Sequence, residues 1–217
     1  MIQDIYPHIY NNTFDPGVKP SNDDIIFSFE EDQVLMKDEH QFYHYHDISK
    51  ESVCYYLFSI DNIKFFLADL TSLNHIKVSF RKMRTFEDQM LGFAAITAWH
   101  LYRWIQDNKY CGKCGHPMDF DKKERAMRCP HCSNIVYPKI SPAVIVGITN
   151  DKGQILVTKY AHGHYQSYAL VAGYYEIGET IEETVKREVK EETGLDVTDI
   201  QYYKSQPWSF SSSLQIG

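Results

Sequence analysis

The chain has 217 residues, of which 43% are hydrophobic and 14% aromatic, and its formal net charge is −7. This length and composition are typical of a folded protein with a sizeable core and more than one domain. The negative charge argues against general binding to nucleic acid or anionic membranes, and no apolar run approaches the ~20 residues that span a bilayer. The opening residues, MIQDIYPHIY, lack the pattern of a secretory signal, so we expect a cytoplasmic protein.

Residues 1–85 predict a β-rich N-terminal domain. After an irregular lead-in, residues 25–80 alternate polar breaks with short apolar and aromatic runs, which favour strands. The histidines of this region have no cysteine or carboxylate to complete a ligand set, and its cysteine lies within an apolar run. We therefore interpret four residues as structural rather than functional: His40, His44, His46 and Cys54.

Residues 86–107 repeat apolar side chains at helical spacing. We expect 86–108 to be a helix that connects two domains and packs against both. Its predicted buried side comprises Met90, Ala94, Ala98, Leu101 and Ile105, with Phe93 and Trp104 nearby.

Residues 109–138 carry two C-x-x-C pairs at the spacing of a zinc ribbon. Four thiolates, Cys111, Cys114, Cys129 and Cys132, complete a tetrahedral Zn²⁺ site and leave no open position, so the predicted role is structural. Free thiols or a redox pair are the alternative reading. His116 and His131 are adjacent candidates for substitute ligands.

Residues 139–217 predict a further domain. ISPAVIVGITN reads as a buried strand, and a turn around Gly153 leads to a second strand. His162 and His164 are interpreted as exposed loop histidines, with approach to a substrate as the alternative. After a helix, DVTDIQYYK is expected to form another strand before Ser205-Gln206-Pro207-Trp208.

The helix of this domain has both of its ends marked in the sequence. Thr180 is a predicted N-cap, and Glu183 completes a capping box. Gly194 is placed to be the left-handed residue that ends the helix. The predicted buried stripe consists of Ile181, Val185 and Val189.

Three carboxylates crowd one face of the same helix. Glu188, Glu191 and Glu192 stand at positions i, i+3 and i+4, where like charges repel unless a cation lies among them. Mg²⁺ or Mn²⁺ prefers such oxygen ligands. We expect Arg187 to point elsewhere and to pair with Glu179. A charged, solvated face is the alternative interpretation.

The pattern Gly-x5-Glu-x7-Arg-Glu-apolar-x-Glu-Glu-x-Gly-apolar, from Gly173 to Leu195, resembles the signature of the Nudix hydrolases at every fixed position. The resemblance implies a divalent-metal enzyme that hydrolyses a diphosphate linkage attached to a nucleoside. It also implies an α/β/α domain with a mixed sheet, and so an α+β multidomain protein.

The order of the parts narrows this resemblance. The zinc ribbon, the Tyr137–Pro142 segment YPKISP, the helix signature and the SQPW tetrapeptide follow one another as in the NADH pyrophosphatase branch, whose members also remove NAD caps from RNA 5′ ends. The implied activity is cleavage of NAD(H) to nicotinamide mononucleotide and AMP. The branch also implies a homodimer, with Trp208 contributed across the interface.

The resemblance assigns roles residue by residue. It implies that Glu188 and Glu192, assisted by Glu191 and by the carbonyl of Ala172, bind the catalytic metal, and that Glu179 and Arg187 belong to the catalytic machinery. The implied substrate contacts are Arg81, Glu124, Tyr137, Tyr174, Gln206, Pro207, Trp208, Ser209, Phe210, Ser211, Ser212 and Ser213. Ser209 and Ser211 stand where the branch has prolines.

The family pattern extends past Gly217, so we expect the sheet to lack strands, a closing helix and a further metal-binding glutamate. Two other functions remain open. One is the same chemistry on ADP-ribose or another nucleoside diphosphate derivative. The other is a zinc-ribbon module that binds nucleic acid without catalysis.

Overall fold

The computed structural model describes residues 1–159 and 167–217, which form two compact units, 1–139 and 140–217. His162 and His164 lie outside the described residues. None of the helices in the described ranges is long and apolar enough to cross a membrane.

Two of the three sheets of the first unit lie before helix α1 (Gln89–Asp107), which confirms the β-rich character of the N-terminal region. The larger has the order β1-β6-β7-β2-β5, from β1 (Tyr10–Asn11), β6 (Tyr55–Ile60), β7 (Ile63–Leu67), β2 (Ile25–Phe27) and β5 (Tyr43–His44). The smaller has the order β3-β4-β8, from β3 (Phe29–Glu30), β4 (Gln33–Met36) and β8 (Ile76–Ser79). The 3₁₀ helix η1 (Tyr45–Asp47) lies between β5 and β6, and a second 3₁₀ helix, η2 (Phe80–Thr85), follows β8. The core is aromatic: the ring of Phe65 packs 5.7 Å from that of Phe27 and 5.2 Å from that of Phe58.

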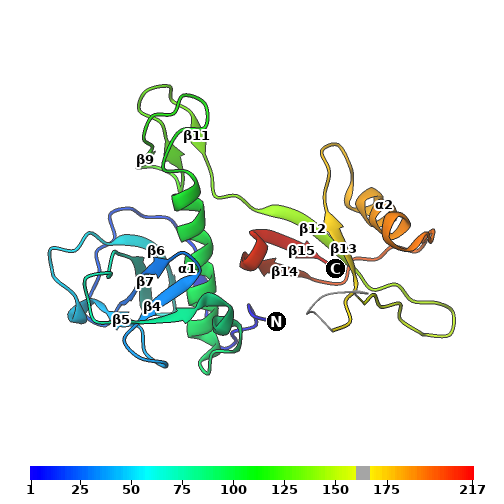
Figure 1. Ribbon diagram of the computed structural model, residues 1–217, viewed down its shortest axis with the longest axis horizontal. Helices are drawn as coiled ribbons and strands as arrows, with labels where there is room; N and C mark the ends of the chain where they lie inside the picture. Colours follow the sequence, from blue (N-terminus) through cyan, green and yellow to red (C-terminus); the bar gives the residue numbers. More distant parts are fainter. Residues whose placement is uncertain (160–166) are drawn as a thin grey trace. The chain divides into compact units, whose positions relative to one another are not determined.

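Helix α1 (Gln89–Asp107) joins the sheets to the cysteine-rich region, as Figure 1 shows. It begins later than expected because the Asp88 carboxylate caps it, accepting a hydrogen bond from Leu91 N at 3.0 Å. Ala94 and Ala98 are fully buried in its N-terminal half, which packs against β6 and β7. Its C-terminal half inserts Trp104 into a cluster with Met118 and the cysteines.

The cysteine-rich region is a small antiparallel sheet of order β11-β10-β9, from β9 (Asp119–Phe120), β10 (Met127–Arg128) and β11 (Ile135–Val136). Such short strands bury little apolar surface, so the sheet depends on Trp104 and on the cysteine cluster for its core.

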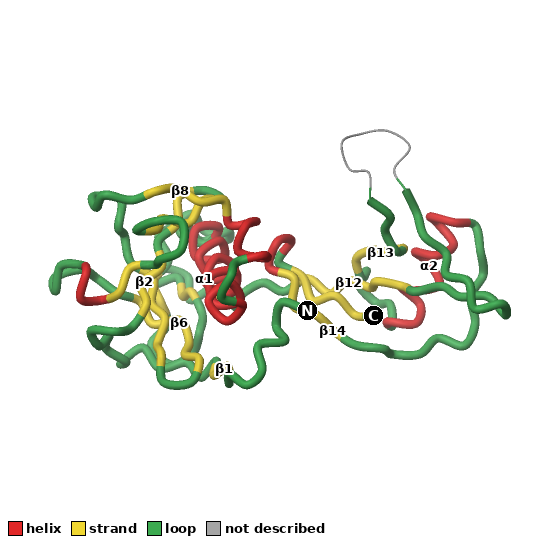
Figure 2. The backbone as a smooth tube through the Cα atoms, turned by 90° about the horizontal axis from the view of Figure 1, so that it is seen from below, coloured by secondary structure: helices red, strands yellow, loops and turns green. Residues whose placement is uncertain are grey.

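The second unit has one four-stranded sheet of order β13-β12-β15-β14, built from β12 (Ser141–Val146), β13 (Val171–Tyr174), β14 (Ser205–Trp208) and β15 (Ser213–Ile216). β12 and β15 run parallel and the other pairs antiparallel, which confirms the expected mixed sheet. Helix α2 (Ile181–Thr193) packs against β12 and β13, as Figure 2 shows. Four valines form the core between them: Val144, Val171, Val185 and Val189.

Two expected strands of this unit are wrong. After the turn at Gly153, the described residues up to Lys159 form isolated bridges in place of a strand, Thr149 to Ile155 and Thr158 to Ala169. Residues 196–204 contain no strand, because Asp199 adopts a positive φ of 53° that interrupts an extended backbone. The strand is instead SQPW itself, which pairs with β15 and is followed by the 3₁₀ helix η3 (Ser209–Ser211).

Candidate functional site

Helix α2 begins and ends as the sequence predicts. The hydroxyl of Thr180 accepts a hydrogen bond from Glu183 N at 3.2 Å, and the Glu183 carboxylate accepts one from Thr180 N at 2.7 Å. Gly194 closes the helix at φ 75°, in the left-handed region that glycine adopts without strain. These caps fix the segment from which the acidic side chains project.

The buried stripe of α2 differs from the predicted one at its first position. Val185 and Val189 are buried, but Ile181 is 39% exposed and Thr184 is fully buried instead. The Thr184 hydroxyl donates to Glu179 Oε2 at 2.8 Å and lies 3.1 Å from Thr180 O, so its burial leaves no polar group unsatisfied. Sequence reasoning missed Thr184; the one available signal was its position four residues after the N-cap.

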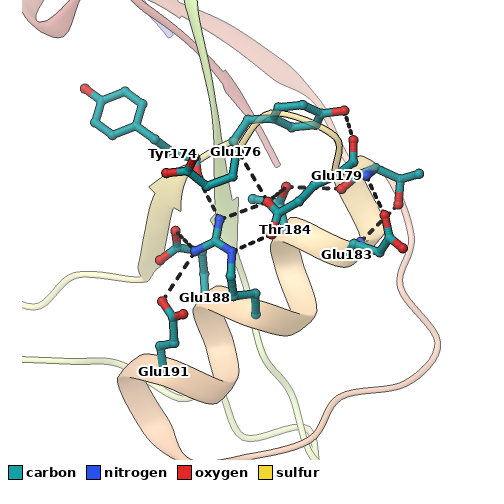
Figure 3. A network of polar contacts seen from close by, with 10 residues as sticks. Tyr174, Glu176, Glu179, Glu183, Thr184, Glu188 and Glu191 are labelled. Atoms are coloured by element: carbon teal, nitrogen blue, oxygen red, sulfur yellow. Dashed lines mark hydrogen bonds and ion pairs between the residues drawn. The ribbon is translucent and has the colours of Figure 1, made fainter.

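Arg187 and Glu179 form the predicted pair across the junction of loop and helix, shown in Figure 3. Arg187 Nε donates to Glu179 Oε1 at 2.6 Å and its Nη2 to Oε2 at 3.0 Å, so the contact is bidentate. Hydrogen bonds from Arg187 lower the pKa of Glu179 to about 2 despite the opposing effect of partial burial. Nη2 also donates to Tyr174 O at 2.9 Å, which ties the end of β13 to the helix.

Glu188 lies against the backbone of β13. A Cβ added to Gly173 would overlap the Glu188 carboxylate, so the glycine provides the space that this side chain occupies. The Glu188 side chain is only 13% exposed, whereas that of Glu191 is 60% exposed and Glu192 is an exposed residue. The three carboxylates therefore differ in how closely they approach the strand.

One expectation about this cluster is wrong: Arg187 does not point away from it. Its Nη1 donates to Glu188 Oε1 at 2.6 Å and to Glu191 Oε2 at 3.4 Å, because the opposite charges attract. Within the described ranges, the groups that bring three potential ligand atoms to within 4.8 Å of one another all include cysteine. The donor set is nevertheless chemically suited to a hard divalent cation, since it consists of carboxylate oxygens, and the Glu188 carboxylate among them occupies the space that a Cβ on Gly173 would take.

The four predicted zinc ligands converge. All four sulfur atoms lie within 4.8 Å of one another; Cys111 and Cys132 are 3.6 Å apart, and Cys114 and Cys129 are 3.5 Å apart. Burial raises the pKa of Cys111, but amide N–H groups of the first knuckle outweigh this effect and bring the pKa to about 6. The His116 amide lowers the pKa of Cys114, but burial and the neighbouring sulfurs outweigh it and raise the pKa to about 12. The convergence of four cysteine sulfurs fits Zn²⁺, as the spacing predicts.

The two histidines beside the knuckles also meet. The rings of His116 and His131 stack with centroids 3.8 Å apart, and with Cys114 they form a second group of potential ligand atoms within 4.8 Å. Both imidazoles are exposed, outside the four-sulfur cluster.

The predicted substrate contacts fall into separate groups. In the first unit, Tyr137 donates its hydroxyl hydrogen bond to Glu124 at 2.6 Å, which raises the pKa of Tyr137, and Arg81 is exposed on η2. In the second unit, Tyr174 is half exposed at the end of β13. The remaining predicted contacts form the β14–η3–β15 hairpin: Gln206, Pro207, Trp208, Ser209, Phe210, Ser211, Ser212 and Ser213.

The side chains of the hairpin differ in their contacts and in their burial. Trp208 and Phe210 pack with ring centroids 4.9 Å apart, whereas Ser209 and Ser213 are buried. The hydroxyls of Ser211 and Ser213 lie 2.8 Å apart. The tetrapeptide is therefore part of the sheet, not a flexible extension of it.

Comparison with known families agrees with this architecture. Residues 139–214 match the NUDIX domain, and residues 106–137 match the NADH pyrophosphatase zinc ribbon domain. The chain thus contains a Nudix domain preceded by a zinc ribbon of the NADH pyrophosphatase type, and the resemblance found in the sequence is confirmed.

Several curated proteins named NAD-capped RNA hydrolase NudC are similar to it. The protein of Klebsiella pneumoniae is 43% identical over 114 residues, which are 52% of this chain and 44% of that protein. The protein of Pasteurella multocida is 41% identical over 119 residues, 54% of this chain and 45% of the relative. The protein of Salmonella typhi is 38% identical over 144 residues, 65% of this chain and 56% of the relative. The chain spans about half the length of these relatives.

Proposed function

We propose that this protein hydrolyses the diphosphate bond of NAD(H) to nicotinamide mononucleotide and AMP, and that it also removes NAD caps from RNA 5′ ends. The observation that carries the proposal is the Glu188 carboxylate, held against Gly173 at the end of β13 beside the Arg187–Glu179 pair. The similarity to NAD-capped RNA hydrolases supports the choice of substrate.

Mg²⁺ or Mn²⁺ is the proposed catalytic metal. Its ligands would be Glu188, Glu192 and the carbonyl of Ala172, with Glu191 assisting. Such a cation, when bound, neutralises charge on the diphosphate and lowers the pKa of an attacking water. Glu191 is the most exposed of the three carboxylates that contact Arg187, and it is accessible to accept a proton from an attacking water.

Arg187 and Glu179 are proposed to position the site. The guanidinium touches Glu179, Glu188, Glu191 and the carbonyl of Tyr174, so it connects the loop before α2, the helix itself and the end of β13. Its hydrogen bonds to Glu179 and Glu188 raise the pKa of Arg187, so the side chain stays charged.

The proposed substrate contacts are those that the resemblance implies. Tyr174 offers a half-exposed ring for stacking, and the Tyr137–Glu124 pair offers a hydroxyl and a carboxylate held in fixed geometry. Arg81 and the hairpin residues from Gln206 to Ser213 complete the set. We also propose a homodimer with Trp208 contributed across its interface, a cytoplasmic location and one structural zinc ion per chain.

The proposal is tested by incubating the purified protein with NADH, NAD⁺ or ADP-ribose and either metal, and by identifying the products chromatographically. We expect NADH to yield the mononucleotide and AMP. Glu192→Gln should lower turnover by ~100-fold or more, since metal binding contributes several kcal/mol. Glu182→Gln is the matched control, because Glu182 is exposed on the same helix outside the network.

An active Glu192→Gln variant would overturn the metal assignment. Hydrolysis of ADP-ribose in preference to NADH would place the same chemistry on another substrate. Salt-sensitive binding of uncapped RNA without metal-dependent hydrolysis would instead favour a nucleic-acid-binding module.

A further inference from the structure

A cavity opens in the first unit. It has a volume of about 90 Å³ and lies between β6, the C-terminal half of α1 and the loop that follows β9. Its walls are largely aromatic: Phe14, Tyr55, Trp104 and Phe120 line it. The rings of Tyr55 and Phe120 are 4.6 Å apart, so two elements far apart in the sequence form one aromatic wall. Neither Glu124 nor Tyr137 is among its lining residues.

Trp104 lines the cavity and carries a buried hydrogen-bond donor. The residue is 5% exposed, and within the described part of the chain its indole Nε1 has no hydrogen-bond partner. An unpaired buried N–H is costly by roughly 1–3 kcal/mol, and such groups are rare in folded proteins. Because this nitrogen exposes almost no surface, a ligand in the cavity would contact the indole ring and not its N–H.

The cavity also carries a positive charge, and none of the carboxylates in the described ranges forms an ion pair with it. Arg125 lines it, and the interactions of its guanidinium are a hydrogen bond to Asn12 O at 3.3 Å and a contact with the Phe14 ring at 5.7 Å. Burial lowers the pKa of Arg125, so the charged form is poorly solvated there. An anion beside this guanidinium would compensate for the lost hydration.

The one carboxylate that lines the cavity is already occupied. Asp121 accepts a hydrogen bond from Arg128 Nε at 2.5 Å and others from the amides of Lys123 and Glu124 at 2.8 Å and 3.1 Å. These bonds, the Lys123 amide first, lower the pKa of Asp121 to about 2. Arg128 therefore balances Asp121, and Arg125 remains the uncompensated charge of the cavity.

From these features we propose that the cavity is a binding site for a small aromatic anion, with its planar ring against the aromatic lining and its anionic group on Arg125. The site is independent of the proposed hydrolysis. The anionic group has two chemical sources, a carboxylate on the ring or the phosphate of a mononucleotide, and both present the same chemistry to Arg125.

The test titrates the ¹⁵N-labelled full chain, loaded with zinc, and follows the indole N–H resonance of Trp104, assigned from its absence in Trp104→Phe. Benzoate is the carboxylate probe, with benzamide as its uncharged analogue and cyclohexanecarboxylate as its non-aromatic analogue. AMP is the phosphate probe, with adenosine as its uncharged analogue. We expect benzoate or AMP to shift the indole resonance at millimolar concentration or below, because an aromatic ring bound against Trp104 changes the magnetic environment of its indole.

Variants then identify the site. Arg125→Gln should weaken binding of the successful probe by at least ~10-fold, and the uncharged analogue should bind the wild type more weakly by a similar factor. Arg125→Lys should retain part of the affinity. Arg103→Gln is the matched control, since Arg103 is exposed on α1 and does not line the cavity.

Two outcomes would overturn the proposal. One is an indole resonance that neither benzoate nor AMP moves at ~10 mM in the folded, zinc-loaded protein. The other is binding that Arg125→Gln leaves unchanged. Because the readout is the resonance of Trp104, AMP bound elsewhere on the chain does not imitate the expected result.

Discussion

At the scale of single residues, the site depends on Gly173 and Arg187. Gly173 leaves room for a carboxylate, and nearly all the N–H groups of the Arg187 guanidinium donate hydrogen bonds. Gly173 admits the Glu188 carboxylate to the backbone of β13, and Arg187 holds that carboxylate together with Glu179 and Glu191. Both residues act by fixing the positions of the carboxylates, so even conservative substitutions of either should have large effects on stability and activity.

Gly173→Ala should displace the Glu188 side chain, because the new Cβ would occupy the position of the carboxylate. We expect a loss of ~1–3 kcal/mol in the free energy of unfolding, as for other overpacked sites, and a fall of ~100-fold in NADH hydrolysis. Denaturant unfolding and the product assay measure the two effects. Gly147→Ala is the control, since its nearest neighbour, Ile155, would be in ordinary contact at 4.0 Å; equal behaviour of the two variants would contradict the role of Gly173.

Glu179 should make stability depend on pH. Hydrogen bonds, chiefly from Arg187, lower its pKa from the ordinary 4.5 to about 2 in the folded protein, so its stabilising effect is complete above about pH 4.5 and disappears as the pH falls towards 2. The difference in Tm between the wild type and Glu179→Gln should therefore be largest near neutral pH and shrink through this acidic range. Calorimetry from pH 2 to 7 measures it, with Glu182→Gln as the control. A difference that stays constant across the range would refute the assignment.

At the scale of elements, helix α2 is the part that its sequence specifies most completely. The capping box at Thr180 and Glu183 and the terminal Gly194 are local signals, and the structure has all three. Thr184 could not be found in the same way, because its burial follows from a hydrogen bond to Glu179, which depends on how the loop before the helix folds. The turn of Arg187 towards Glu188 and Glu191 is also a matter of side-chain rotamers, which helical spacing does not determine.

Thr180→Ala should destabilise α2 by about 1 kcal/mol, because the amide of Glu183 loses its acceptor and the capping box is broken. Equilibrium denaturation followed by circular dichroism measures the change. Lys186→Ala, at an exposed position in the same helix, should stay within about 0.5 kcal/mol of the wild type. A Thr180→Ala variant as stable as that control would show that the cap contributes nothing.

At the scale of the whole molecule, zinc should control the stability of the first unit. Its ribbon strands are only two residues long, and their core is shared with Trp104 of α1, whose other end packs on the N-terminal sheet. Removing the metal with a chelator should release one zinc ion per chain and lower the Tm of this unit, since structural zinc contributes on the order of 10 kcal/mol to folding.

Cys114→Ser should reproduce the effect of the chelator, whereas Cys54→Ser, at a half-buried cysteine outside the cluster, should retain the metal. Metal analysis and near-ultraviolet circular dichroism of the tryptophans distinguish the two variants. A Tm that does not respond to chelation would contradict the structural role of the ribbon.

The features that the sequence predicts are those formed by residues close together in the chain. Features that depend on contacts between distant segments are harder to predict. The cysteine pairs and the α1 and α2 helices are encoded in short windows, and the mixed character of the second sheet came from the family resemblance. The strand assigned to residues 196–204 was wrong because its place in the sheet is taken by Ser205–Trp208, whose partner is β15. Pairing of this kind depends on which segment reaches the sheet, and Pro207 made the tetrapeptide an unpromising strand.

Pro207 itself has a consequence for how the protein behaves in concentrated solution. Within the described part of the chain, β14 is an outer strand, and its third residue has no amide hydrogen. If a strand from a neighbouring molecule paired with β14, the backbone hydrogen bonds between the two strands would be interrupted at Pro207, after two residues. Sheet-to-sheet polymerisation is thus discouraged here by a residue that the family resemblance assigns to substrate binding, and replacing it with a β-branched residue would remove that protection.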